Sequence, residues 1–543
     1  MQSKIRFEWK KLIIFLIPFI AFLFRLNDIY YGLPDGSNIY HKVPYFGDEA
    51  MILGNFKKLI VFLHTRNPIH LLHWTNTFTY TFLGRALAFL IYAPMVLLTR
   101  KDFLGKSPAV IEVLKVMQMT LSGRIISLIA SFLCLILIYK LLKLLKAKSL
   151  YIWLALIYIA FNSADVLISI QSKANALMNL FILLCLYCSL LWLEKNGKKL
   201  KYLLVAAGFS ALAMTSRLNG GLSFFIVWSS FLLQFRFNLK KILEKKKEIV
   251  LIIISFLITF VIAYPATFFN SLEFLRLWQI ASGDRLTTNI NWHGVFSSLR
   301  YLAGGSLGVV VLITITILSL IYFKKMNKKE RVVAAWFYLY LLISCSTAGC
   351  AIRYLYPLLA TYILLFYIVI KRLFNYLKKK SFFLLGITVT VLILIFTTNF
   401  FLGLSMLDFY NGKDIRLETV KFVNDNFPEN SSIGTYLYPE FYAPYVPLDY
   451  DKYDLISYRA REEFGIDKQY LFPWWRSNNN RPDYLVVERR GYWDPGFQEF
   501  FGVKDNYKLI KTFDRKLKDF GPFVFSNSYS ASYATVVRVF ERI

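Results

Sequence analysis

Three long stretches of this chain carry no charged residue: 249–272, 332–352 and 381–404. A helix needs about 20 predominantly apolar residues to cross the hydrocarbon core of a bilayer, and each stretch is long enough to do so. Hydrophobic residues make up 56% of the 543 positions. The sequence therefore predicts a polytopic α-helical membrane protein.

The gaps between the apolar runs alternate between two kinds. One kind is strongly basic and comprises 140–148, 195–201, 236–247, 324–331 and 371–380. The other kind holds few charges and comprises the gap with Asp165 and Lys173, the gap with Arg217 alone, the stretch 270–300 and the gap with Arg353 alone. Because Lys and Arg are retained on cytoplasmic loops, we expect a cell (cytoplasmic) membrane protein with a cytoplasmic N-terminus and an extracytoplasmic C-terminus.

The runs predict about eleven transmembrane helices. They are 11–26, 121–142, 149–163, 174–194, 200–215, 220–236, 249–269, 302–323, 332–349, 353–370 and 381–404. The apolar segment 78–99 does not fit this count, because one more crossing would put the basic gap 140–148 outside. We therefore predict one large outer loop over 27–120, with 78–99 along the membrane surface or re-entering it, and leave open whether 78–99 crosses.

The formal net charge of +30 has two interpretations. A basic chain is typical of nucleic-acid binding, but no such motif occurs in the sequence. The charge is explained by cytoplasmic loops facing membrane lipids, so we expect no nucleic-acid partner.

The composition changes after about residue 404. LETVKFVNDNFPENSSIGTYLY predicts an amphipathic helix, a turn and a strand, and RPDYLVVER and ATVVRVFERI predict further strands. We expect a transmembrane domain over 1–404, with outer loops 27–120 and 270–301. An extracytoplasmic α/β domain is expected over 405–543.

Asp48 and Glu49 form an adjacent acid pair in the first outer loop. Acids in the first turn of a helix are favoured by the helix dipole, so the pair is explained equally well as an N-terminal cap. The functional alternative is a general base at the edge of the bilayer, which needs a second substrate held beside it.

Arg217 and Arg353 are the sole charges in their outer gaps, and Arg285 lies in the outer stretch 270–300. A single arginine there is often an interfacial residue that extends to the headgroups. Several arginines at the same depth predict an anion site, because guanidinium groups bind phosphate oxygens bidentately.

All five histidines fall in predicted outer loops. His70 and His73 are spaced to share one helix face and, with a carboxylate, could ligate a metal, whereas the plainer alternative is a hydrogen-bonded interfacial loop. His293 lies in the stretch 270–300. We therefore leave a divalent metal open and expect no other cofactor.

The order of these motifs resembles the GT-C superfamily of polyprenyl-phosphate-sugar-dependent glycosyltransferases, in its protein O-mannosyltransferase and aminoarabinose-transferase branch. The matching motifs are Asp48–Glu49, NPIHLLHWTNTFTYTFLG, SGRIISL with Arg124, TSRLNGG with Arg217, RYLYP with Arg353 and Tyr354, and the C-terminal VNDNFPENSSI and RPDYLVV. Two departures are Asn67–Pro68 in a segment that usually carries His/Lys-Pro-Pro, and Arg217 where Lys is usual. The WWD motif of oligosaccharyltransferases is absent from the sequence.

The resemblance implies a membrane hexosyl- or pentosyltransferase that moves a sugar from a polyprenyl-phosphate donor to a glycan, lipid or protein acceptor. Asp48 and Glu49 would be catalytic. The lipid phosphate would be bound by Arg217, Arg353, Arg285 and Arg124, and the acceptor or sugar by His70, His73, His293 and Tyr354. The alternative is a transporter or flippase of lipid-linked sugars, which needs the outer cations but no base.

Overall fold

The computed structural model describes residues 16–31, 33, 82–99, 105–264, 292–345, 352–437, 446–449, 451–459, 481–488, 495–515, 517–520 and 536–543. The chain forms two compact units. The helical unit is Met1–Ile29, Gly54–Ile91 and Ser122–Met406, and the mixed unit is Tyr30–Leu53, Tyr92–Leu121 and Leu407–Ile543.

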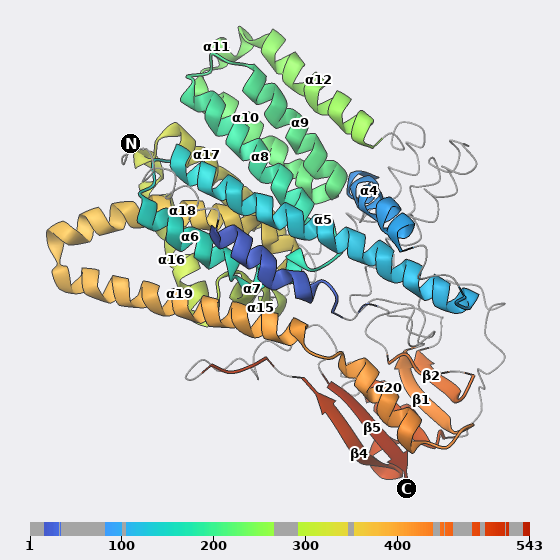
Figure 1. The fold of residues 1–543 in the computed structure, drawn as a ribbon. Helices are drawn as coiled ribbons and strands as arrows, with labels where there is room; N and C mark the ends of the chain where they lie inside the picture. Colours follow the sequence, from blue (N-terminus) through green and yellow to red (C-terminus); the bar gives the residue numbers. More distant parts are fainter. Residues whose placement is uncertain are drawn as a thin grey trace, which may run out of the picture. The chain divides into compact units, whose positions relative to one another are not determined.

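The described chain before the C-terminal sheet is almost wholly helical (Figure 1). It begins with a helix over 16–28. The helices that follow are α4 (Phe82–Leu98), α5 (Pro108–Leu144), α6 (Ser149–Ala160), α7 (Ser163–Ser169), α8 (Asn175–Glu194), α9 (Lys201–Ser216), η4 (Leu218–Ser223), α10 (Phe224–Gln234), α11 (Leu239–Leu243), α12 (Lys246–Ala263), α15 (Trp292–Leu302), α16 (Ser306–Tyr322), η5 (Phe323–Lys325), α17 (Lys328–Cys345), α18 (Ile352–Lys380) and α19 (Phe382–Asn411). Helix α9 packs between α8 and α12, and α17 packs against α10 and α18.

Five described helices are long and apolar enough to cross a membrane, or six if the bent pair α6–α7 is one span. These helices make the chain a multi-pass membrane protein. Each expected crossing contains a described helix, but α9 and the η4–α10 pair are shorter apolar helices. The count of eleven crossings therefore stays a prediction, as does the path of 78–99, most of which forms α4.

The expected crossing 149–163 contains a break. Helix α6 ends at Ala160 and α7 continues at an angle of 56°. Asn162 stabilises the break: its Oδ1 accepts from Ala164 N at 3.0 Å, and its Nδ2 donates to Leu302 O at 2.9 Å and Asn399 Oδ1 at 2.8 Å. A polar side chain thus replaces the backbone hydrogen bonds that the break removes.

Helix α5 presents small residues at four-residue spacing to the α7 region. Gly123 faces Ser172, where an added Cβ would lie 2.0 Å from its Oγ. Ser127 Oγ donates to Lys173 O at 3.0 Å, and Ser131 Oγ to Asp165 Oδ2 at 3.0 Å. Small residues on one helix face allow this close approach, as is usual between membrane helices.

The basic gaps meet at one end of the helical unit. Lys329 Nζ donates to Leu144 O at 3.0 Å and forms an ion pair with Glu194. Arg372 pairs with Glu330 at 2.5 Å. These contacts join the ends of α5, α8, α17 and α18, as the alternation of basic and neutral gaps predicts.

The C-terminal part of the mixed unit is a five-stranded sheet of order β2-β1-β3-β5-β4 (Figure 1). Its strands are β1 (Ser432–Leu437), β2 (Asp454–Arg459), β3 (Tyr484–Glu488), β4 (Tyr507–Asp514) and β5 (Val536–Arg542). Strands β1, β2 and β3 are parallel, whereas β5 is antiparallel to both β3 and β4. The expected α/β character of this region is confirmed.

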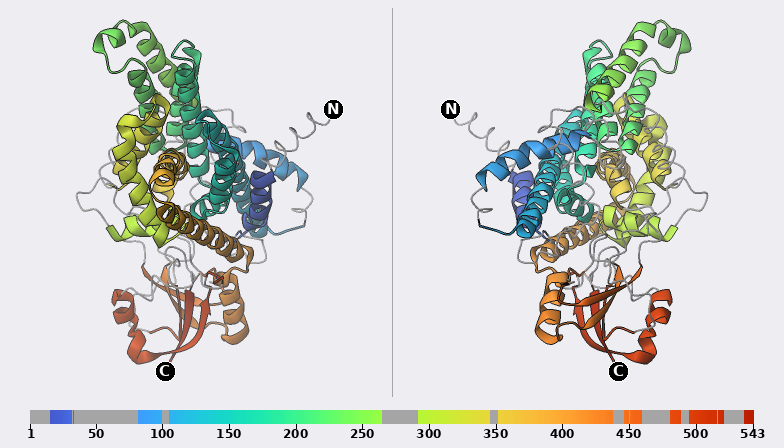
Figure 2. Two further views of the ribbon diagram at one scale, coloured as in Figure 1. Left: turned by 90° about the vertical axis from the view of Figure 1, so that its left-hand side faces the viewer. Right: turned by 90° about the vertical axis from the view of Figure 1, so that its right-hand side faces the viewer.

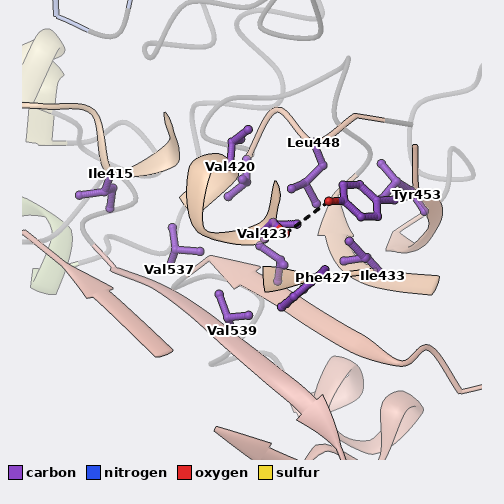
Figure 3. Packing of buried hydrophobic residues seen from close by; sticks show 12 residues of the cluster. Ile415, Val420, Val423, Phe427, Ile433, Leu448, Tyr453, Val537 and Val539 are labelled. Atoms are coloured by element: carbon purple, nitrogen blue, oxygen red, sulfur yellow. Dashed lines mark hydrogen bonds between the residues drawn. The ribbon is translucent and has the colours of Figure 1, made fainter. Parts of the chain in front are cut away.

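Helices cover both faces of this sheet (Figure 2). On one face α20 (Ile415–Asn426) packs Val420 and Val423 against Val486 and Val539, and Tyr453 Oη donates to Val423 O at 3.3 Å (Figure 3). On the other face α22 (Pro495–Phe501) precedes the short α23 (Val503–Asn506). Alternate residues of β3 serve the two cores, as the period of a strand requires.

Candidate functional site

Arg217 lies at the junction of α9 and η4. It ends α9, and its backbone is extended (φ −156°, ψ 142°). The chain then turns back tightly, because a Cβ on Gly220 would lie 2.2 Å from Ala213 O. The glycines of the LNGG segment thus permit the turn that fixes the position of Arg217.

The Arg217 side chain is buried between two other helix starts. Its Nη1 donates to Oδ1 of Asn175, the first residue of α8, which is fully buried. Its Cζ lies 5.3 Å from the centroid of the Tyr354 ring, in the first turn of α18. Arg217 therefore links the ends of α8, α9 and α18.

Arg353 contacts the same ring. Its Cζ also lies 5.3 Å from the Tyr354 centroid. The structure thus brings together three residues that the motifs singled out, together with Asn175, as one group that we name the Tyr354 cluster. Two guanidinium groups near one aromatic ring are a cationic surface suited to an oxyanion.

Two asparagines near this cluster carried no signal in the sequence. Asn175 orients Arg217, and Asn219 Nδ2 donates to Tyr340 Oη at 2.7 Å, which fastens η4 to α17. Asn175 lies at the start of the expected crossing 174–194, and Asn219 lies in the polar stretch TSRLNGG, where an amide is common. Only the approach of distant helices reveals their contacts.

Arg124 has a different position. It is fully buried in α5, and its Nη1 donates to Ile29 O at 2.6 Å, just past the first helix. The structure therefore gives it a contact with the start of the expected outer loop 27–120, and its role toward a lipid phosphate stays a prediction.

A second polar group in the helical unit was not anticipated, and we name it the Asp165 network. Arg25 Nη1 donates to Asp165 Oδ2 at 2.8 Å, and Arg25 Nη2 donates to Ala160 O. Asp165 Oδ1 accepts from Tyr356 Oη at 2.5 Å, and Ser131 Oγ donates to Oδ2 at 3.0 Å. Every member of the network is buried.

Several predicted site residues lie outside the described residues: Asp48, Glu49, His70, His73 and Arg285. His293 lies in α15, but its side chain is also outside them. Within the described ranges, no group of three or more His, Cys, Asp or Glu side chains could hold a metal ion. The divalent metal stays open.

No family model and no curated protein matches the chain. A crystal structure of ArnT from Cupriavidus metallidurans bound to undecaprenyl phosphate is similar over 97% of each chain, with 11% identity and a TM-score of 0.46. Archaeal oligosaccharyltransferase AglB from Archaeoglobus fulgidus, in complex with an inhibitory peptide and a dolichol-phosphate, is similar over 98% of this chain and 76% of that chain, with 11% identity and a TM-score of 0.44. At these scores the likeness is too distant to carry an argument about function.

Proposed function

We propose that the protein is an inverting glycosyltransferase that moves a sugar from a polyprenyl-phosphate donor to an acceptor hydroxyl at the outer membrane face. The observation that carries the proposal is the approach of Arg217 and Arg353, distant in sequence, to the single ring of Tyr354 at 5.3 Å each. Both arginines lie at helix ends in the gaps that hold few charges, and not in the basic gaps. This supports a site at the depth of the lipid headgroups.

A lipid phosphate is the anion that suits this site. As the glycosidic bond breaks, negative charge grows on the phosphate oxygens, and fixed guanidinium groups stabilise that charge. Arg217 is held for this task by the Asn175 amide, so little reorganisation is needed when the phosphate leaves. We assign Arg285 and Arg124 to the same anion as further contacts.

The remaining steps belong to the first outer loop. Asp48 takes the proton of the acceptor hydroxyl, the acceptor oxygen attacks the anomeric carbon, and the bond from that carbon to the phosphate oxygen breaks. Glu49 orients Asp48 or binds the acceptor. We assign His70, His73, His293 and Tyr354 to the sugar or the acceptor, which is a glycan, a lipid or a protein.

The base is tested with Asp48→Asn. We expect transfer to fall by a factor of about 100 or more, because a general base contributes about 10²–10⁴ in rate. Cells lacking the gene are complemented with either form, and their lipid-linked sugars and glycans are compared by mass analysis. The purified variant should bind undecaprenyl phosphate as the wild type does.

Arg331→Gln is a control substitution away from the proposed site, since Arg331, like Arg217 and Arg353, lies over an aromatic ring, 5.9 Å from the Phe323 centroid, but at the basic end. It should change neither transfer nor lipid binding. Near-normal transfer by the Asp48 variant would remove the base from the mechanism and favour the flippase alternative.

A further inference from the structure

The short helix α11 joins the ends of α10 and α12 at the basic end of the helical unit (Figure 1). Gln234, the last residue of α10, accepts from Lys328 Nζ at 3.3 Å through its backbone carbonyl and at 3.1 Å through its side-chain oxygen. Since Lys328 begins α17 in the basic gap 324–331, these bonds join two basic gaps. The segment 235–247, which we name the α11 turn, thus lies at the end of α10 remote from Arg217.

The backbone leaves α10 through two left-handed residues that are not glycine. Arg236 has a φ of 54° and Phe237 a φ of 57°, in a region that favours glycine. Phe237 N donates to Leu232 O at 3.0 Å, which closes the end of α10. Asn238 then caps α11, and its Oδ1 accepts from Lys241 N at 3.1 Å. This hydrogen-bonded but strained turn leaves the Phe237 side chain 61% exposed.

Helix α11 adds two more exposed apolar side chains beside its lysines. Leu239 is 74% exposed and Leu243 is 69% exposed, whereas Ile242 is buried and fastens the helix to the unit. Residues four apart lie on the same side of a helix, so Leu239 and Leu243 form one apolar edge. Lys240 and Lys241 lie on the other sides and are exposed. Large apolar side chains exposed on a charged surface indicate contact with a membrane or with a partner protein.

The charge of the α11 turn restricts what can cover these apolar side chains. Residues 236–247 include six Lys and Arg against a single acid, Glu244. Among the described residues, neither Lys240 nor Lys241 forms an ion pair, so both ammonium groups are available at the surface. A surface with this excess of positive charge attracts anions. The occupant of the α11 turn is therefore negatively charged and apolar at once.

Helix α12 indicates where the acyl chains of the membrane lie. Its exposed apolar residues include a series separated by three or four positions, namely Val250, Ile254, Leu257 and Val261. A soluble protein rarely exposes such a stripe, so we infer that acyl chains cover it. The stripe begins three residues after Lys247. The α11 turn thus combines apolar side chains, lysines and a lipid-facing helix, as an amphipathic segment at a membrane surface does.

We propose that the α11 turn binds anionic phospholipid at the expected cytoplasmic face of the membrane. Phe237, Leu239 and Leu243 enter the acyl region just below the headgroups, and Lys240 and Lys241 contact the headgroup phosphates. An acidic protein would also suit the lysines, but lipid accounts in addition for the apolar stripe of α12 beside them. The inference does not rest on the proposed function, since none of these residues belongs to the Tyr354 cluster.

The test is native mass spectrometry of the full-length protein with an equimolar mixture of phosphatidylglycerol and phosphatidylcholine that share the same acyl chains. We expect the wild type to bind phosphatidylglycerol about tenfold more tightly than phosphatidylcholine. Lys240→Glu combined with Lys241→Glu should raise the Kd for phosphatidylglycerol about tenfold or more, because both lysines attract the anionic headgroup. The Kd for phosphatidylcholine should not change. Lys240→Gln combined with Lys241→Gln is a milder pair and should give an intermediate rise.

Lys198→Glu combined with Lys199→Glu is the matched control. These lysines are also adjacent and exposed, in the turn between α8 and α9, but the described turn 195–201 has no large apolar side chain that is exposed. The control makes the same change of net charge and should raise the Kd for phosphatidylglycerol about twofold or less. An equal rise in the two pairs would mean that only the overall charge of the basic end matters, which overturns the inference.

Leu243→Ala tests the apolar part of the surface. It should raise the Kd for phosphatidylglycerol about threefold, because less apolar area enters the acyl region. Leu394→Ala is its control, since Leu394 is 46% exposed in α19 but lies within the charge-free run 381–404. Thermal unfolding shows whether each variant is folded. Equal affinity for the two lipids, or an unchanged Kd in both Lys240/Lys241 pairs with loss of a co-purifying acidic protein, would also overturn the inference.

Discussion

The helical unit holds two arginine groups that use the same residue types differently. In the Asp165 network, Arg25 faces a carboxylate at 2.8 Å whose other oxygen is bound by Tyr356. In the Tyr354 cluster, Arg217 and Arg353 share one ring, and Arg217 donates to a neutral amide. In the first group the arginine faces a carboxylate, whereas in the second two guanidinium groups meet at one aromatic ring.

The difference indicates which group is structural. A buried arginine whose charge is matched within the protein holds helices together, and removing its partner is costly. Two arginines that meet at one ring from distant helix ends are arranged as the anion site that we propose requires. Tyr354 and Tyr356 lie in the first turns of the same helix, so one residue separates the two groups.

Asp165→Asn should give the largest effect. It removes the charge that compensates Arg25, and breaking a buried pair costs about 3–5 kcal/mol. The measurement is unfolding of the purified protein in detergent by heat or denaturant. Asp28→Asn is the comparison, because Asp28 is fully buried and lies near the charge of Arg25, but within the described residues neither of its oxygens is hydrogen-bonded.

Asp28→Asn should lose less stability than Asp165→Asn, since the carboxylate that it removes lies near Arg25 but is not hydrogen-bonded to it. If the two variants lost the same stability, the Asp165 network would not be the structural lock that its contacts suggest. If Asp165→Asn abolished lipid binding in a fully stable protein, the contrast between the two arginine groups would be reversed.

A smaller effect is expected from Gly403→Ala, which tests the helix packing behind the network. A Cβ at Gly403 would lie 1.9 Å from Phe161 O, in the chain that follows Ala160. Overpacking of this kind costs about 1–3 kcal/mol. Gly386→Ala in the same helix is the control, because nothing lies within 4 Å of its Cβ; equal unfolding midpoints would contradict a close α19 contact.

Local patterns predicted much of the fold. Charge-free runs mark helices because the bilayer requires them to be apolar, and the 417–438 pattern of helix, turn and strand is formed by α20 and β1. The strands β2 and β4 were missed. Their sequences, DLISYR and YKLIKTFD, mix charged and apolar residues because both lie at sheet edges.

The candidate site was predictable only in part. Arg217 and Arg353 stand out because a lone charge between apolar runs is costly without a use. Asn175 and Asp165 do not stand out, because their importance comes from helices that meet only in three dimensions. The sequence shows where a charged residue lies along the chain, but not which distant residue contacts it.

Asn175→Asp should give the smallest of these effects and the sharpest test of the comparison. It places a carboxylate where Arg217 now meets an amide. Arg217 would then face a carboxylate, as Arg25 does in the Asp165 network. An internal anion competes with a lipid phosphate for Arg217, so we expect the Kd for undecaprenyl phosphate to rise about tenfold, or about 1.4 kcal/mol. Thermal stability should hold or increase, because the buried guanidinium meets a carboxylate in place of an amide. Asn327→Asp is the control at the basic end, where Asn327 Oδ1 accepts from Glu330 N at 3.0 Å and an aspartate serves equally well as a cap. Unchanged lipid affinity in Asn175→Asp would mean that Arg217, like Arg25, has a structural role.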